Sequence, residues 1–166
     1  DPGYPTPADQ ADYLGMIHEP LQTNPKNRFL FSTRDIHADT TDLIMTNFPH
    51  NPSGQVATRG WWRNLCTFCE GNNIRLFNDA AYAVLAHSEE ACTLTDAISG
   101  DFLNLSWAEA FSASKVIGNG TGWRIGAMIG SPDFIADIAT IKGNSDSGFF
   151  APAAAATGNL FNVEFT

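Results

Sequence analysis

The sequence predicts an α/β fold, with three α/β/α layers around a mostly parallel sheet. Segments typical of strands and helices alternate along the chain, which is the order found in α/β proteins. Polar and glycine-rich segments follow the predicted strands, where open α/β sheets bind their ligands. The 166 residues are 43% hydrophobic and 16% charged. A chain of this length buries about 70% of its unfolded surface, so we expect one globular domain over residues 1–166.

The first clear strand is predicted at residues 43–48. The forty residues before it are rich in Pro, Asn, Asp and Thr and are expected to be mostly loop. Their apolar stretch at residues 29–31 predicts a short strand or two. Residues 43–48 are a nearly continuous apolar run that ends at Pro49, as is typical of a strand covered on both faces. A dense turn signal follows at residues 49–54.

A helix and a second strand come next. Thr58 can cap the helix, and Gly71 with the two asparagines after it can end it. Residues 74–77 then predict a second strand, and a strand–helix–strand order places the two strands parallel. The helix carries apolar side chains at helical spacing, namely Trp61, Trp62, Leu65, Cys66, Phe68 and Cys69.

The second half of the chain predicts two more strands and another helix. The third strand is expected at residues 102–108 and the fourth at residues 124–130. A helix should follow over residues 132–142. Pro132 suits its first turn, and Asp133 is favourable near the positive end of the helix.

Charge, hydropathy and cysteine content argue against several classes of partner and site. Eighteen acidic and nine basic residues give a net charge of -9, which repels nucleic acid and anionic membrane surfaces. No apolar run approaches the ~20 residues of a membrane span. Three cysteines, an odd number, favour a reducing compartment, so we expect a cytoplasmic protein.

No metal site is expected. Cys66 and Cys69 form a single CxxC on the amphipathic helix, where buried packing is a better interpretation than zinc or redox chemistry. The four histidines are scattered without the spacing of metal ligands.

The segment from residue 111 to residue 126 has the composition of a phosphate site beside a reactive amine. It places Lys115 and Arg124 among hydroxyls and glycines, in a chain with nine basic residues. Glycines let backbone N–H groups approach an anion, and a guanidinium binds it with two donors. The glycine spacing matches neither the dinucleotide loop nor the P-loop, so a solvated surface loop is the alternative.

Two earlier segments favour the functional interpretation. Asn51 follows the first predicted strand, and Asp79 and Tyr82 follow the second, so a parallel sheet would bring all three to one edge. A lysine amine, an acid, a phenol, an amide and a phosphate-binding loop are together what pyridoxal 5'-phosphate (PLP) requires.

These segments resemble the signatures of a known family. Residues 47–54 read Asn-Phe-Pro-His-Asn-Pro-Ser-Gly, and residues 77–82 read Phe-Asn-Asp-Ala-Ala-Tyr. Ser-Ala-Ser-Lys follows at residues 112–115, with Thr-Gly-Trp-Arg-Ile-Gly at residues 121–126. In this order they resemble the class I/II aminotransferases of PLP fold type I, and the resemblance covers roughly residues 1–141. Asp-Ala-Ala-Tyr is similar to LL-diaminopimelate and aspartate-aminotransferase-like members.

The resemblance implies the central part of a PLP-dependent transferase large domain and a role for each candidate residue. Lys115 would form a Schiff base with the PLP aldehyde and move the substrate proton. Asp79 would pair with the ring nitrogen, and Tyr82 and Asn51 would hydrogen-bond the ring oxygen.

The remaining candidates would hold the phosphate or face the substrate. Ser112 and Ser114 would donate to the phosphate, and Arg124 would bind it with two donors. Tyr4, in a Pro-Gly-Tyr-Pro segment, would lie on the substrate side. The substrates implied are an amino acid and a 2-oxo acid, and family members form homodimers.

The resemblance also implies missing parts, which leaves three functions open. Family members are more than twice this length, with a phosphate loop upstream and a carboxylate-binding arginine downstream of the matched region. The first hypothesis is an aminotransferase. The second is a PLP-dependent β-lyase or decarboxylase on the same fold. The third is a truncated, non-catalytic subdomain.

Overall fold

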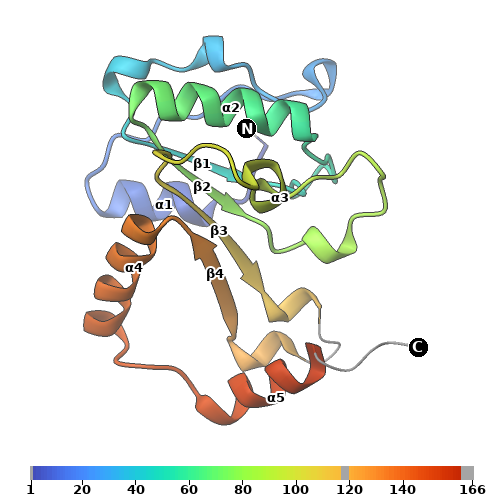
Figure 1. Cartoon of the computed structure of the whole chain (residues 1–166), viewed down its shortest axis with the longest axis vertical. Coiled ribbons are helices and arrows are strands. Elements are labelled where there is room, and N and C mark those ends of the chain that lie inside the picture. The colour runs from blue at the N-terminus through green and yellow to red at the C-terminus, as the bar shows by residue number, and fades with distance from the viewer. Residues whose placement is uncertain (1, 117–119, 162–166) are drawn as a thin grey trace.

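The computed structural model describes residues 2–116 and 120–161, and its centre is a four-stranded sheet in the order β1-β2-β3-β4 (Figure 1). β1, β2 and β3 are parallel, and β4 is antiparallel to β3. This confirms the prediction of an α/β fold with a mostly parallel sheet. The strands are β1 (Leu43–Asn47), β2 (Arg75–Asp79), β3 (Trp107–Ser112) and β4 (Gly126–Gly130).

Helix α2 (Arg59–Asn72) covers one face of the sheet. Successive strand side chains point to opposite faces, and Ile44 and Leu76 point toward α2. They form one buried core with Trp62 and the other apolar residues of α2. The short helix α3 (Leu94–Ile98) contributes to the same core.

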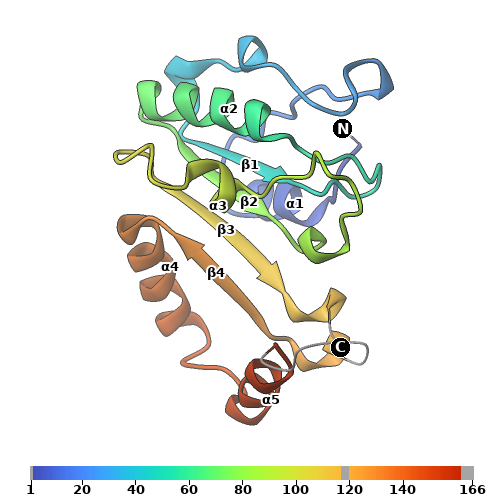
Figure 2. The same ribbon diagram turned by 45° about the vertical axis from the view of Figure 1, so that its right-hand side comes forward.

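Helix α4 (Pro132–Ser145) covers the other face, next to β3 and β4 (Figure 2). Its buried residue is Phe134. The ring of Phe134 stacks on Phe77 with 6.4 Å between centroids. Phe77 directly follows Leu76 in β2, so its side chain points to the opposite face, away from α2. Helices on both faces confirm the three-layer arrangement.

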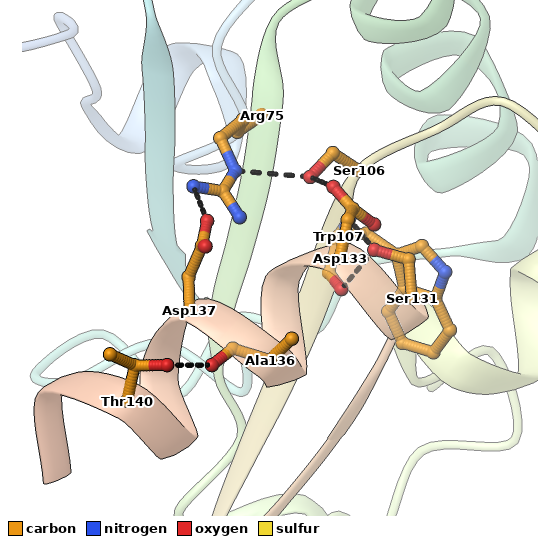
Figure 3. Close-up of polar contacts among 8 residues, drawn as sticks. All are labelled: Arg75, Ser106, Trp107, Ser131, Asp133, Ala136, Asp137 and Thr140. Carbon is orange, nitrogen blue, oxygen red and sulfur yellow. Dashed lines mark hydrogen bonds and ion pairs between the residues drawn. The ribbon is translucent and has the colours of Figure 1, made fainter. Parts of the chain in front are cut away.

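A polar cluster fixes α4 against the starts of β2 and β3 (Figure 3). The guanidinium of Arg75 lies 4.2 Å from the centroid of the Phe134 ring and 2.9 Å from the Asp137 carboxylate. Its Nε donates to the Ser106 hydroxyl at 3.0 Å. Ser106 in turn donates to Asp133, and this hydrogen bond lowers the pKa of the Asp133 carboxyl.

The N-terminal forty residues differ from the prediction, because no strand occurs in the described part of this region. Helix α1 (Thr6–Tyr13) is followed by short 3-10 helices. Arg28 and Phe29 have φ angles of 54° and 56°, in the left-handed region, which an extended strand does not contain. The strand predicted at residues 29–31 is therefore wrong. The 3-10 helices are Pro25–Asn27, Thr33–Asp35 and Ala38–Thr40.

The third strand was also misplaced. It begins at Trp107, not at residue 102, and extends to Ser112. Phe102 has a φ of 59°, and its carbonyl accepts a hydrogen bond from the Leu105 N–H at 3.2 Å, so this apolar stretch is a turn. The fourth strand begins two residues later than predicted, because Arg124 is left-handed with a φ of 55°.

The main helices lie where the sequence predicts them. α2 begins directly after the predicted cap Thr58 and continues through Gly71 to Asn72, so it ends within the segment predicted to close it, and α4 continues three residues beyond residue 142. Helix α5 (Ala151–Phe161) was not predicted. Within residues 2–116 and 120–161, no helix combines the length and hydropathy needed to span a bilayer.

Candidate active site

The three parallel strands end at one edge of the sheet, and candidate residues follow these ends. Asn47, the last residue of β1, is in register with Asp79, the last residue of β2. Asp79 is in register with Ala110 of β3, and Ser112 ends β3 two residues later. Asn51 lies four residues beyond β1. The topology thus places Asn51, Asp79 and Ser112 at a common edge.

Asn47 connects two of these positions. Its Nδ2 donates to the Asp79 carbonyl at 2.8 Å, and its Oδ1 accepts from the Asn51 N–H at 2.9 Å. The Asp79 carboxylate is oriented by the Ala81 N–H, which donates to Oδ1 at 3.1 Å. Asn47 was not among the candidates. The signal for it was an amide side chain at the last position of a strand, in the same motif as Asn51.

Lys115 and Tyr82 come from different elements and lie together. Lys115 ends the 3-10 helix Ala113–Lys115 directly after β3, and Tyr82 precedes the 3-10 helix Ala83–Leu85 that follows β2. The Lys115 Nζ is 5.5 Å from the centroid of the Tyr82 ring. This is within the range of a cation–π contact. Lys115 is exposed, so its amine can reach a ligand at the sheet edge.

The predicted phosphate segment folds back on itself through hydrogen bonds. The Ser112 hydroxyl accepts from the Ser114 N–H at 3.2 Å. Ser114 and Thr121 exchange hydrogen bonds between hydroxyl and carbonyl groups at 3.5 and 3.2 Å. Arg124 Nη1 donates to the Thr121 carbonyl at 3.1 Å. The fold therefore gathers Ser112, Ser114 and Arg124, although residues 117–119 of the loop lie outside the described residues.

Thr121 was missed by sequence reasoning even though it belongs to a quoted motif, because a hydroxyl among glycines does not show that it will pair with Ser114. Gly126 then returns the chain to β3, in register with Ser112. A Cβ at Gly126 would lie 2.7 Å from the Phe111 carbonyl oxygen, so this close approach requires glycine. The return to β3 keeps Arg124 near the end of that strand.

Tyr4 has no direct interaction with the other candidates within the described residues. Its side chain is 51% exposed in the N-terminal segment. Over residues 2–116 and 120–161, no hydrogen bond or ring contact joins it to another candidate residue. Its role on the substrate side stays a prediction.

An open groove of about 690 Å3 lies beside the sheet edge, and Asn51 and Tyr82 line it. Asp79 and Lys115 are not part of its lining. His50 also lines the groove, with its Nδ1 2.6 Å from the Ser53 hydroxyl. Burial lowers the pKa of His50 from its ordinary value of 6.5. The groove thus borders the part of the candidate site that Asn51 and Tyr82 form.

Comparison with known proteins identifies the family. The sequence profile described as aminotransferase class I and II matches residues 5–162. The chain belongs to this family. Class I and II aminotransferases are PLP-dependent enzymes, so PLP is the cofactor to test against the site.

Curated relatives of this chain include LL-diaminopimelate aminotransferases. The protein of Methanococcus maripaludis is 30% identical over 154 residues, which cover 91% of this chain and 36% of the relative. A second protein of that name, from Trichormus variabilis, is 30% identical over 169 residues, covering 99% of this chain and 42% of the relative. The chain thus spans roughly two fifths of these relatives or less.

Solved structures share the fold. The substrate-bound BacF structure from Bacillus subtilis superposes with a TM-score of 0.86 at 24% identity, covering 98% of this chain and 41% of that chain. An aspartate aminotransferase from Thermotoga maritima gives a TM-score of 0.81 at 22% identity, covering 98% of this chain and 44% of the other. At these identities the similarity concerns the fold.

The residues at the sheet edge fit PLP. An exposed amine lies beside a phenol ring, in Lys115 and Tyr82. Asp79 uses Oδ1 for a backbone N–H, and its other oxygen accepts no hydrogen bond within the described residues. Arg124 uses one nitrogen on Thr121 and keeps further donors for an anion. These groups match the amine, carboxylate and phosphate-binding groups that the cofactor needs.

Proposed function

We propose that the protein to which this chain belongs is a PLP-dependent aminotransferase that moves an amino group between an amino acid and a 2-oxo acid. The observation that carries the proposal is the common edge of the three parallel strands. It supports placing the Asp79 carboxylate, the Lys115–Tyr82 pair and the Ser112–Arg124 loop around one ligand.

Lys115 is the central residue of the proposal. PLP, when bound, supplies an aldehyde carbon and an electron-withdrawing ring. The Lys115 amine would hold the cofactor covalently, and once freed it would move a proton at the substrate Cα. Its position beside the Tyr82 ring, directly after β3, restricts where that amine can reach.

The other candidates would orient the cofactor. Asp79 would hold a proton on the ring nitrogen by charge pairing, which keeps the ring electron-withdrawing. Tyr82 and Asn51 would donate hydrogen bonds to the ring oxygen. Hydroxyls and a guanidinium bind phosphate through charge-assisted hydrogen bonds. This role falls to Ser112, Ser114 and Arg124.

The test is covalent labelling of the full-length protein. After incubation with PLP, borohydride reduction and proteolysis, mass spectrometry should find the pyridoxyl adduct on Lys115. The described segment offers internal controls, because Lys26 and Lys142 lie on other elements and should stay unlabelled. Labelling of Lys26 or Lys142 in place of Lys115 would overturn the assignment.

The names of the relatives suggest the first substrate to try. We propose LL-diaminopimelate as amino donor with a 2-oxo acid as acceptor, because the curated relatives described above are LL-diaminopimelate aminotransferases. Stoichiometric formation of the new amino acid supports transamination, whereas release of ammonia or carbon dioxide would indicate a lyase or a decarboxylase. A homodimer, a cytoplasmic location and a role in amino-acid metabolism belong to the same proposal.

A further inference from the structure

A buried polar network lies behind the candidate site, on the α2 side of the sheet. Asn78 and Glu109 are 0% and 6% exposed and are in register on β2 and β3. The Asn78 Nδ2 donates to the Glu109 Oε1 at 2.8 Å. Side chains alternate along a strand, so Asp79, the neighbour of Asn78, points to the opposite face.

Asn78 holds the chain that leads to Asn51. Its Oδ1 accepts from the Phe48 N–H at 2.9 Å and from the Thr46 hydroxyl at 3.0 Å. Its Nδ2 donates to the Phe48 carbonyl at 3.1 Å as well as to Glu109. Three positions of the amide are thus used by donors or acceptors of their own, and the Thr46 proton is shared between Asn78 and the Phe77 carbonyl oxygen, also at 3.0 Å. Phe48 is thus fixed at both its N–H and its carbonyl, three residues before Asn51.

Glu109 closes the network from the other side. Its Oε1 accepts from Asn78 and from the Leu94 N–H, the latter at 2.9 Å. Its Oε2 accepts from the Thr95 N–H at 3.0 Å and from the Thr95 hydroxyl at 2.6 Å. A carboxylate offers about four acceptor positions, and here four donors occupy them. A fully satisfied buried network of this kind is rigid.

We propose that Glu109 is a positioning residue for the PLP site. It locks Asn78, and Asn78 fixes the strand ends from which Asp79 and Asn51 extend. The inference rests on the proposed function, because it concerns how precisely these two residues meet the cofactor. Displacement of a reacting group by about 1 Å can cost about a hundredfold in rate, so precise placement of the strand ends matters.

The decisive variant is Glu109→Gln in the full-length protein. The amide keeps one acceptor oxygen and places an N–H₂ group against donors, so the network cannot stay satisfied. We expect the Kd for PLP, measured by titration of the apo-protein, to rise on the order of tenfold or more, as when partners that orient ligand residues are removed. The pH dependence of the absorption of the bound cofactor should also shift. Circular dichroism sets a temperature at which all variants are folded.

Two controls separate positioning from general stability. Glu70→Gln makes the same chemical change at a carboxylate outside the network. Glu70 accepts one hydrogen bond, from the Asn104 N–H at 2.9 Å, and its substitution should leave the Kd for PLP unchanged. Thr93→Ala removes the side-chain cap of α3 without touching Asn78 or Glu109, and should also leave it unchanged. An equal rise in Kd for Thr93→Ala would overturn the proposal, because Glu109 would then act only through α3.

A milder variant decides the matter if Glu109→Gln does not fold. Thr95→Val keeps the carboxylate and removes one hydroxyl donor, and the Kd should rise by about threefold, because only part of the free energy of the lost hydrogen bond is transmitted to the PLP site. If the folded Thr95→Val variant binds PLP with an unchanged Kd, the positioning role of Glu109 is contradicted, but the proposed function is not. Absence of the Lys115 adduct in the wild-type protein contradicts the proposed function itself, and this inference with it.

Discussion

At the scale of single residues, we expect PLP binding to depend on the planar guanidinium of Arg124. Its Nη1 is held by the Thr121 carbonyl, and the remaining donors of the planar guanidinium are fixed in direction by that bond. A lysine keeps the charge and loses the paired donors. We expect Arg124→Lys in the full-length protein to weaken PLP binding by about tenfold, which a titration followed by absorbance would measure. Arg34→Lys, on the 3-10 helix Thr33–Asp35, is the matched control and should bind normally.

The cysteines of α2 illustrate burial at the level of a single thiol. Cys66 and Cys69 are fully buried, as predicted for packing residues, and burial raises the pKa of each thiol to about 12. Both should resist iodoacetamide at pH 8 in the native protein and react after unfolding. Cys92, which is partly exposed, should react first. Rapid native alkylation of Cys66 would contradict this burial.

The same thiols predict how stability changes with pH. The pKa is raised in the folded state, so the unfolded chain loses these protons first as the pH rises above 9. The free energy of unfolding should therefore fall between about pH 9 and pH 12, by up to about 1.4 kcal/mol per pH unit for each thiol. Urea denaturation at pH 8 and pH 10 measures the change. A variant with Cys66 and Cys69 both changed to alanine should lose this part of the alkaline dependence.

For Lys115, Asp79 and Arg124, residue type and order along the chain indicated functional positions, and the structure places Asp79 and Lys115 at or directly after strand ends, while the roles of all three stay predictions. Glu109 was not predicted, although an acid within the apolar strand residues 107–111 was a signal. Its burial depends on donors from Leu94 and Thr95, fourteen to fifteen residues earlier in the chain. Such contacts are set by the tertiary fold, so a pattern along the sequence does not reveal them.

Among the elements, the β3–β4 pair depends on close backbone approach. A Cβ at Gly130 would lie 2.3 Å from the Trp107 carbonyl oxygen and 2.9 Å from the Ala108 Cα, both backbone atoms that cannot rotate away. We expect Gly130→Ala to lower the free energy of unfolding by about 1–3 kcal/mol, as overpacking does. Gly143→Ala is the control, because nothing lies within 4 Å of its Cβ in α4. An alanine there should raise helix stability, by up to about 1 kcal/mol.

The start of helix α2 and the segment in which it ends were predictable because local and long-range signals agree. The Thr58 hydroxyl accepts from the Trp61 N–H at 3.2 Å, so the predicted cap is present. The third strand was misplaced for the opposite reason. Phe102 and Leu105 are apolar, yet they lie in a turn, and hydropathy alone does not separate a turn from a strand when both are partly buried.

At the scale of the whole molecule, the alternating order of strands and helices was enough to predict three layers, but not how far each layer extends. α2 lies over one face next to β2, and α3 lies on the same face, where it contacts α2 and donates hydrogen bonds to Glu109 of β3, whereas α4 contacts β3 and β4 on the other face (Figure 2). Met45 of β1 is 48% exposed on the α4 side, and Ile129 of β4 is 54% exposed on the α2 side. The two helical layers are therefore offset across the sheet.

This offset has a practical consequence for handling the 166-residue chain in solution. Exposed apolar side chains on the two edge strands of the sheet can associate with those of other molecules. An edge strand favours such association because it pairs with a neighbour on one side only. We expect the hydrodynamic radius, followed by dynamic light scattering, to grow with concentration. Replacing Met45 and Ile129 by threonine preserves charge and strand preference and should suppress that growth. If the radius of the unsubstituted chain stays the same at every concentration, these two edges do not cause association.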